Sequence, residues 1–277
     1  MLTALSVRIP EQPSGVRRLA HRLRRDKVKI TFRRARGVTL KHVTYISYSG
    51  QVRLEKTDSV IGMQRSRLLC ADNLIFPHNS GYRRFSSRSF KQRLCTNTAL
   101  AVLKALPPDA ALRLGIADIY GGFPEFMLKA LRCCGDVTVL TRGGEVYAEA
   151  QELALNELGA SAVITSRPED LRGCDLVVAP DSGCVLPDLG ENTVVLAVEP
   201  PSRERSEQWY YSYKIQVPGG FDGIKPEELD GEYFCSALYT LGEQYELGSM
   251  VPERVEGSGR TRTIETLCAS LDNRRQK

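Results

Sequence analysis

The stretch that decides the fold is residues 112–142, LRLGIADIYGGFPEFMLKALRCCGDVTVLTR. It contains an apolar run (112–117), a glycine turn at Gly121-Gly122, an amphipathic run (124–134) and a second apolar run (137–141). This order of runs is typical of a strand–helix–strand unit with parallel strands. The stretch therefore predicts an α/β fold. Because ligands in such sheets bind beyond the carboxyl ends of the strands, the glycine turn is the first place to look for a site.

Strand and helix patterns continue to alternate after this stretch. The sequence predicts a helix over 145–158, which Gly159 closes. It predicts further strands over 162–165, 175–179, 193–198 and 214–218. Runs such as VVLAV (194–198) are apolar on both faces, as expected of parallel strands that are covered on two sides. With right-handed crossovers, this pattern predicts a doubly wound parallel sheet. A last helix is predicted over 226–239, where Glu227 and Glu228 suit the helix dipole.

The region before this sheet is β-rich. Strands are predicted over 27–32, 38–47 and 51–56, with a hairpin turn at Ser49-Gly50, and helices are predicted near 14–25 and 89–106. Pro107-Pro108 ends the second helix, so we expect a domain boundary there. The resulting division is a β-rich region (1–106), an α/β domain (107–250) and a mobile tail that contains Gly-Ser-Gly and ends in RRQK (251–277).

Composition places few limits on the function. The 277-residue chain has no apolar run long enough to span a bilayer and no signal-peptide pattern at its start. None of the eight cysteines forms a C-x-x-C pair, and only three histidines are present to complete a metal site. Reduced thiols, no metal and a cytoplasmic location are therefore expected.

Charge divides the chain into two unlike parts. Residues 1–105 carry 22 Lys and Arg against 5 Asp and Glu, a net +17, whereas residues 106–277 carry a net −12. The basic part could bind nucleic acid, an acidic protein surface (including the acidic part of this chain or of another copy in a homo-oligomer) or an anionic membrane surface. It could also contain a presequence or be a solvated basic face. The residues in question are Arg17, Arg18, Arg22, Arg24, Arg25, Arg33, Arg34, Arg83 and Arg84, with four aromatic residues available for stacking, Tyr45, Tyr48, Tyr82 and Phe85.

Residues 112–200 resemble the NAD(P)-binding domain of the shikimate dehydrogenase and glutamyl-tRNA reductase type. The resemblance covers about a third of the chain and is carried by four short pieces: the Gly121-Gly122 turn, VLTR (139–142), LGA (158–160) and LRGCDLVV (171–178). It implies a Rossmann-like fold and, by extension, NAD(P) as a cofactor candidate. These pieces are common to many Rossmann-like proteins, so they indicate a fold more than an activity.

The glycine turn departs from the dinucleotide fingerprint G-x-G-x-x-G. The first strand is followed by Asp118, and the helix begins with Pro124 and Glu125. Proline has no N–H for a phosphate, and both carboxylates lie where a diphosphate would bring further negative charge. The sequence therefore indicates that the helix N-terminus is satisfied by the protein's own carboxylates.

One residue points the other way. Arg142 follows Gly121 by 21 residues, near the position where NADP-binding proteins accommodate the 2′-phosphate. Arg142 could equally be a solvated loop charge, and Asp181, in the crevice beyond the strands, could equally be the turn-forming residue of P-D-S-G. The cofactor-binding candidates are Gly121, Gly122, Thr141, Arg142, Ser166 and Asp181.

No catalytic set can be assigned. His21, His42 and His78 have no evident nucleophile or carboxylate partner, and Cys133-Cys134 point to different faces of a helix. Two hypotheses remain. The sequence favours a non-catalytic protein that acts through binding surfaces, as a regulator or assembly factor. The alternative is an NADP-linked oxidoreductase or nucleotide-binding protein that uses the Gly121-Gly122 turn and Arg142.

Overall fold

The computed structural model describes residues 1–11, 24–107, 110–181, 183–204 and 207–272. The chain forms two compact units. Unit 1 comprises Met1–Ser87 and Val217–Tyr245, and unit 2 comprises Arg88–Gln216 and Glu246–Lys277. Each unit is therefore assembled from two separate segments of the chain.

Unit 2 is built on a six-stranded parallel sheet with the order β6-β5-β4-β7-β8-β9. Numbered along the sheet's own strands this is 3-2-1-4-5-6, the order of a Rossmann-like fold. The predicted parallel α/β sheet is thus confirmed. The strands are β4 (Arg113–Ala117), β5 (Asp136–Leu140), β6 (Val163–Thr165), β7 (Leu176–Ala179), β8 (Val194–Ala197) and β9 (Gln208–Tyr210).

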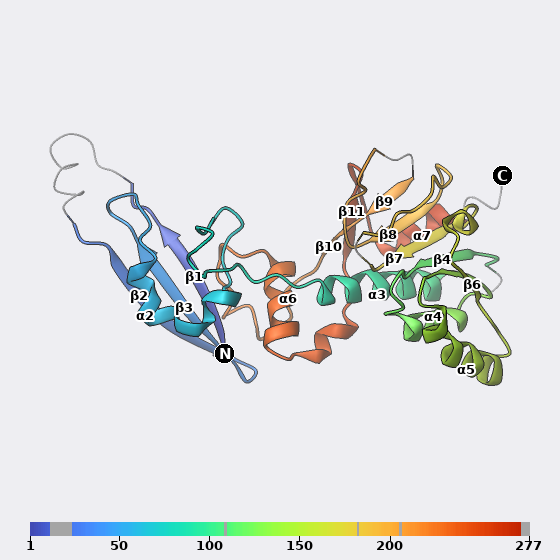
Figure 1. Ribbon diagram of the computed structural model, residues 1–277, viewed down its shortest axis with the longest axis horizontal. Coiled ribbons are helices and arrows are strands. Elements are labelled where there is room, and N and C mark those ends of the chain that lie inside the picture. Colours follow the sequence, from blue (N-terminus) through green and yellow to red (C-terminus); the bar gives the residue numbers. More distant parts are fainter. Residues whose placement is uncertain (12–23, 108–109, 182, 205–206, 273–277) are drawn as a thin grey trace. The chain divides into compact units, whose positions relative to one another are not determined.

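Helices pack on one face of this sheet (Figure 1). They are α3 (Ser89–Ala105), α4 (Pro124–Leu131) and α5 (Ala148–Leu158), which follows the short η2 (Gly144–Tyr147), and α7 (Ile264–Asp272) packs on α3. The other face is covered by Leu186, Leu189 and Trp209, together with Leu171 of η3 (Pro168–Leu171). The expectation of a doubly wound sheet therefore holds only in part for the described residues, because the connections after β6 and β7 contain proline and glycine and form no α-helix.

Much of the segment expected to form a mobile tail forms secondary structure, between Arg254 and Asp272. Residues 254–257 and 260–262 form β11 (Arg254–Gly257) and β12 (Arg260–Arg262). In a second, antiparallel sheet, β11 lies in the middle and pairs with β12 on one side and β10 (Ser212–Lys214) on the other. Ser258 and Gly259 connect β11 and β12 with φ values of 47° and 70°. Positive φ at both central residues is what a type I′ hairpin requires, so Gly-Ser-Gly marks a tight turn here. The strand predicted over 214–218 is displaced toward the N-terminus, because the observed strand, β10, ends at Lys214. It also lies outside the parallel sheet.

Unit 1 contains a three-stranded sheet of order β1-β3-β2. β1 (Leu2–Arg8) pairs in parallel with β3 (Val38–Ile46), and β2 (Lys27–Ala35) pairs antiparallel with β3 through a hairpin turn at Arg36-Gly37. The predicted hairpin at Ser49-Gly50 and the strand over 51–56 are wrong. The chain instead forms α2 (Glu55–Ile61), whose acidic first turn favours a helix, and then η1 (Gly62–Arg67).

The domain boundary also differs from the prediction. Helix α3 belongs to unit 2 because its apolar side, including Phe90, Leu94 and Val102, is buried against β7 and β8. Unit 1 regains residues 217–245, which include α6 (Gly231–Leu241), and η4 (Tyr245–Ser249) follows. Helix α6 begins later than predicted because the Asp230 carboxylate caps it by accepting the N–H of Glu232.

Two further expectations concern helices. The helix predicted near 14–25 lies outside the described residues except for Arg24 and Arg25, which are not helical. Among the described residues, no helix has the length and apolar character needed to cross a membrane.

Candidate functional site

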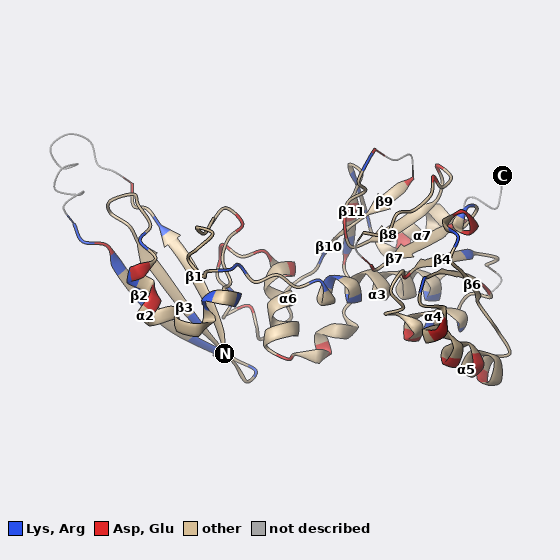
Figure 2. Ribbon diagram, in the orientation of Figure 1, with Lys and Arg blue, Asp and Glu red and all other residues tan. Residues whose placement is uncertain are grey.

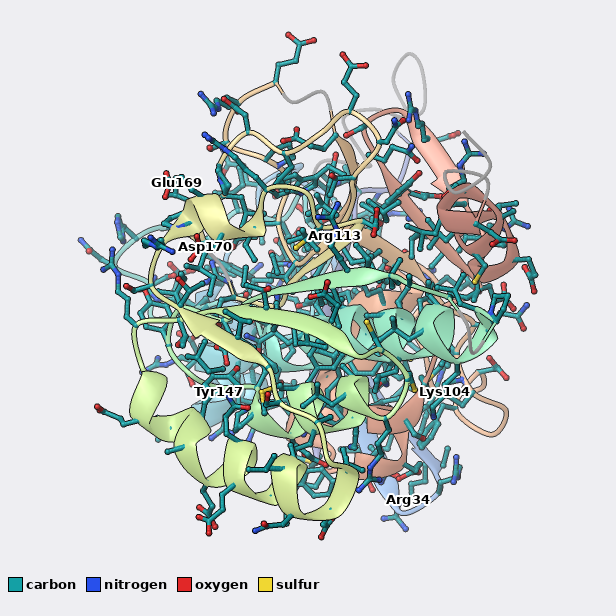
Figure 3. All side chains as sticks on the ribbon, turned by 90° about the vertical axis from the view of Figure 1, so that its right-hand side faces the viewer. Arg34, Lys104, Arg113, Tyr147, Glu169 and Asp170 are labelled. Atoms are coloured by element: carbon teal, nitrogen blue, oxygen red, sulfur yellow. The ribbon has the colours of Figure 1, made fainter. Side chains whose placement is uncertain are left out.

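The turn after β4 is organised around the carboxylate of Asp118, which is completely buried. It accepts the backbone N–H groups of Gly122 at 2.9 Å and Phe123 at 2.8 Å. The hydroxyl of Tyr147 donates a third hydrogen bond to it. Figure 3 shows Tyr147 on the side of the sheet that faces α5. Because Pro124 has no N–H, Asp118 takes the two backbone donors that directly precede the proline-led helix α4.

A second loop closes over the glycines of this turn. Gly121 has a φ of +75°, and a Cβ at this position would lie 3.3 Å from Cβ of Val146 and 3.5 Å from the carbonyl oxygen of Gly143. The N–H of Arg142 donates to the carbonyl of Ile119 at 3.1 Å. The loop after β5 therefore packs directly on the loop after β4. The packing of these two loops and the left-handed backbone at Gly121 explain why a glycine is needed there, without any need for a ligand.

A second carboxylate, that of Asp181, follows β7 and lies beside Asp118. Its Oδ2 accepts the N–H of Tyr120 at 3.2 Å. Burial raises the pKa of Asp181 to about 6, and two effects of Asp118 contribute, its hydrogen bond with Asp181 and its charge. A second carboxyl group beside it makes ionisation of Asp181 less favourable, because two adjacent negative charges repel each other. The same repulsion disfavours a phosphate at this edge of the sheet.

The crevice beyond β7 and β8 is small. Its cavity has a volume of about 160 Å³ and is lined in part by Asp181, Cys184, Glu199 and Trp209. Burial, together with the charges of Asp181 and Asp118, raises the pKa of the Cys184 thiol to about 12. The thiol therefore stays protonated and cannot serve as a nucleophile. Pockets that hold drug-sized ligands or cofactors usually measure roughly 300–1,000 Å³.

The structure brings together only some of the residues that the sequence singled out. Gly121, Gly122 and Asp181 meet at Asp118. Thr141 is buried, and its hydroxyl accepts the N–H of Gly143 at 3.0 Å, so it shapes the loop after β5. The side chains of Arg142 and Ser166 are exposed at the ends of β5 and β6.

Two other acid and hydroxyl side chains need comment. Glu125, expected to serve the helix N-terminus, instead forms an exposed ion pair with Lys129 at 2.7 Å, which lowers the pKa of Glu125. The sequence did not identify Tyr147 as part of the site. Its contact with Asp118 spans 29 residues, and nothing in the local pattern signals it.

The basic residues of unit 1 differ in how available they are. Arg84 is occupied, because it pairs with Asp72 and lies 3.7 Å from the ring centroid of Tyr233. Arg33 donates to the carbonyl of Gly223 at 3.3 Å. Arg25, Arg34 and Arg83 are exposed, Arg24 lies over the ring of Tyr48 at 5.8 Å, and Arg17, Arg18 and Arg22 lie outside the described residues. Three of the four aromatic residues considered for stacking on bases are buried, namely Tyr45, Tyr82 and Phe85.

Strand β2 of unit 1 carries exposed basic side chains. Figure 2 shows Lys and Arg along it. It is an edge strand, and Lys27, Lys29 and Arg34 are exposed on it. Ile30 and Phe32, which alternate with the lysines, are 43% and 60% exposed. This combination of cations and apolar groups on an open sheet edge was not recognised in the sequence.

Metal and thiol chemistry find no support in the part of the chain that is described. No group of three or more potential metal ligands occurs there. All eight cysteines are free of disulfide bonds. Burial is the main factor that raises the pKa of seven of them, to about 11 or 12 for Cys70, Cys95, Cys174, Cys184 and Cys235, and it also raises the pKa of Cys134 and Cys268. His78 is exposed, His42 is described below, and His21 lies outside the described residues.

Comparison with known proteins adds little to this geometry. No family model matches the chain, and no curated protein matches it. A structural match was found to the crystal structure of a ligand-free 5-ketofructose reductase from Gluconobacter sp. strain CHM43, at 13% sequence identity and a TM-score of 0.30, covering 84% of this chain and 87% of that one. So remote a likeness carries no argument about activity. The Rossmann-like assignment rests on the strand order of the parallel sheet.

Proposed function

We propose that the chain is a non-catalytic binding protein, a regulator or assembly factor, whose Rossmann-like unit serves as a scaffold and holds no dinucleotide. One observation carries this proposal: the buried carboxylate of Asp118 accepts the N–H groups of Gly122 and Phe123. Dinucleotide-binding folds offer the N–H groups at this helix N-terminus to the diphosphate. A diphosphate here would have to displace a carboxylate that the protein itself has buried.

The energetic cost of that displacement is large on the scale of ligand binding. Leaving a buried charged group without its hydrogen bonds costs about 1–3 kcal/mol or more. The incoming anion would also meet the negative charge of the Asp118–Asp181 pair and the Val146 loop packed on Gly121. These terms all oppose binding, and none of the described residues of the turn offsets them.

Binding would then take place on unit 1. Lys27 and Lys29 project from one face of the edge strand β2, and Ile30, Phe32 and Arg34 project from the other. A partner at this edge therefore meets both cations and apolar groups, which fits an acidic protein surface that also offers apolar contacts. Burial of Tyr45, Tyr82 and Phe85 removes most of the aromatic platform that single-stranded nucleic acid would use. We therefore favour an acidic protein partner over nucleic acid.

Thermal-shift titration tests the scaffold role. With NADP⁺, NADPH, NAD⁺ or NADH at millimolar concentration we expect no rise in the melting temperature, because a bound ligand stabilises the folded state by mass action. A saturable rise with any of the four contradicts the proposal. Arg142→Ala is the matched variant, and it should melt at the same temperature as the parent with and without each nucleotide.

The second candidate function, NADP-linked binding or oxidoreduction, rests on one observation. Arg142 is exposed at the carboxyl end of β5, where this fold accommodates a 2′-phosphate. If it is correct, NADPH stabilises the parent and Arg142→Ala loses more of that stabilisation with NADPH than with NADH. Equal loss for both cofactors removes the role assigned to Arg142.

The partner-binding role has its own experiment. A labelled oligoglutamate should bind the full-length protein. The variant Lys27→Glu/Lys29→Glu/Arg34→Glu should bind it about tenfold more weakly, because each of the three lost charge pairs contributes roughly 0.5 kcal/mol to binding. Arg172→Glu, an exposed change in unit 2, is the control and should leave the affinity unchanged. Binding that is indifferent to salt, or tighter binding of a single-stranded oligonucleotide than of oligoglutamate, contradicts an acidic protein partner.

A further inference from the structure

The outer edge of β1 is paired over only part of its length. The N–H of Leu5 donates to the carbonyl of Leu69 at 2.8 Å, and the N–H of Leu69 donates to the carbonyl of Thr3 at 2.9 Å. Backbone groups of a strand alternate in direction, so the N–H and C=O of Val7 point outward as those of Thr3 and Leu5 do. The carbonyl of Arg8 points the other way and accepts from Ser47 on the β3 side. Within the described chain, no strand pairs with this edge beyond Leu5.

A groove runs along this unpaired edge. It has a volume of about 640 Å³, and all of its lining residues belong to unit 1. One side is β1 and the residue after it (5–9), another is the segment 71–74, and the remaining lining residues are Val52, Glu227 and Glu228. The volume is in the range of sites that hold ligands, roughly 300–1,000 Å³.

The two walls of the groove differ in polarity. Successive side chains of a strand point to opposite faces. Val7 and Leu74 pack against the apolar cluster on one face of the sheet. Ser6 lies on the other face, where its hydroxyl is 2.5 Å from Nε2 of His42. Glu228 approaches the same Nε2 at 3.4 Å.

The polar wall has a net negative charge. Burial is the main factor that lowers the pKa of His42, against the opposing effect of Glu228, so the imidazole is neutral near neutral pH. The groove is lined by two carboxylate side chains, Glu227 and Glu228, and by one cation, Arg8. Ser6 and Glu228 both meet Nε2, so His42 cannot relay a proton from one to the other through its two nitrogens. The cluster is arranged for binding and not for nucleophilic catalysis.

We propose that this groove binds an extended segment of a partner protein, added as a strand at the edge of β1, with basic residues facing Glu227 and Glu228 and apolar residues facing Val7 and Leu74. Main-chain hydrogen bonds to an open edge supply affinity in this mode, and alternate side chains supply specificity. The groove is distinct from the β2 surface, which presents the opposite charge and a different strand edge.

Anisotropy with a labelled eight-residue peptide of alternating Lys and Val tests the backbone part. Val7→Pro removes the outward N–H at a position where an edge strand tolerates proline, because that N–H takes no part in pairing with β3. Val7→Ala is the matched control, since it shortens the side chain and keeps the N–H. We expect Val7→Pro to bind the peptide about tenfold more weakly than Val7→Ala, because proline removes one hydrogen bond and adds a steric block. Equal affinity of the two variants overturns strand addition and leaves only a small-molecule or side-chain site.

The charge part has separate arms. An alternating Glu and Val peptide should bind the parent protein more weakly than the Lys and Val peptide. Glu227→Gln/Glu228→Gln should reduce the affinity for the Lys and Val peptide about fivefold, because the two exposed charge pairs that are lost together contribute just under about 1 kcal/mol to binding. Asp222→Asn, an exposed carboxylate of the same segment that does not line the groove, should have no effect. Equal affinity for the two peptides overturns the assigned chemistry of the partner.

A measurement on the unaltered protein guards against misfolding of the proline variant. Hydrogen exchange of the Val7 amide, followed by NMR, should slow at least tenfold when the Lys and Val peptide is added at saturation, because a strand at this edge would take that N–H. Unchanged exchange of the Val7 amide at saturating peptide overturns the proposal.

Discussion

The carboxylate of Asp118 has the role at the β4 turn that a ligand's phosphate has in dinucleotide-binding folds. It is acceptor to two backbone N–H groups and the Tyr147 hydroxyl, and burial prevents water from competing. The same burial has a consequence for its neighbour. Asp181 must stay near another carboxyl group, so its proton is held unusually tightly in the folded protein.

This tight hold predicts a pH-dependent stability. The pKa of Asp181 is about 6 in the folded state and about 3.9 in an unfolded chain. The folded state therefore binds more protons between these values, so the stabilisation is present below about pH 4 and is lost as the pH rises through 6. Asp181→Asn removes the titration and keeps an oxygen acceptor for Tyr120. Relative to the parent, the variant should gain about 1–2 kcal/mol between pH 4 and pH 7, a value reduced for solvent screening.

Urea denaturation of both proteins at intervals from pH 4 to pH 7 provides the measurement. Asp188→Asn, an exposed carboxylate of the same loop, serves as the control and should follow the parent at each pH. A constant difference between Asp181→Asn and the parent across this range would show that the pKa of Asp181 is not raised in the folded protein.

Sequence reasoning reached part of this site. Asp118 was recognisable because it stands directly between a buried strand and a glycine turn, where a second negative charge is unfavourable. Asp181 was placed at the same sheet edge by topology. Its contact with Asp118 was not foreseeable, because adjacency of β4 and β7 depends on a crossover past β5 and β6. Tyr147 was missed for the same reason, since its partner is distant along the chain.

At the level of elements, parallel strands were easier to predict than hairpins. Strands β4, β7 and β8 carry almost only apolar residues on both faces and therefore stand out from their surroundings. The Arg36-Gly37 and Ser258-Gly259 turns lack the usual Asn-Gly or Asp-Gly signal, although both have positive φ at their two central residues. The second turn was consequently interpreted as part of a mobile tail.

The hairpin of β11 and β12 depends on one close backbone approach. A Cβ on Gly257 would lie 2.1 Å from the carbonyl oxygen of Trp209 and 2.8 Å from Cα of Tyr210. Both contacts are with backbone, so neither can rotate away. Gly257→Ala should therefore destabilise the protein by about 3 kcal/mol. Gly135→Ala is the control, since nothing lies within 4 Å of its Cβ position, and it should change stability by less than about 1 kcal/mol.

Chemical denaturation of the two variants provides the comparison. If Gly257→Ala is as stable as Gly135→Ala, then β11 does not cross β9 as closely as described, and the C-terminal segment contributes less to unit 2 than its burial indicates.

At the scale of the whole molecule, the chain leaves unit 1 after Ser87 and returns to it at Val217. The returning segment, 217–245, carries six carboxylates and one lysine, so it reduces the positive charge of the unit that it joins. Its carboxylate Glu228 reaches His42, and its Phe221 lies 5.0 Å from the guanidinium of Arg36. A boundary drawn from charge alone could not find this return, because the acidic segment and the basic strands are complementary parts of one unit.

This discontinuity predicts how fragments will fold. The register places Leu2, Ala4 and Leu40 on the same face of the sheet as His42, and all three are buried. In a fragment of residues 1–106 that face loses the segment that contacts it, so we expect an expanded state that binds the dye ANS and shows no cooperative thermal unfolding. Residues 1–87 joined by a flexible Gly-Ser linker to 217–245 should instead unfold cooperatively with little dye binding. A cooperative transition in the 1–106 fragment would mean that the β1-β3-β2 sheet is stable without residues 217–245.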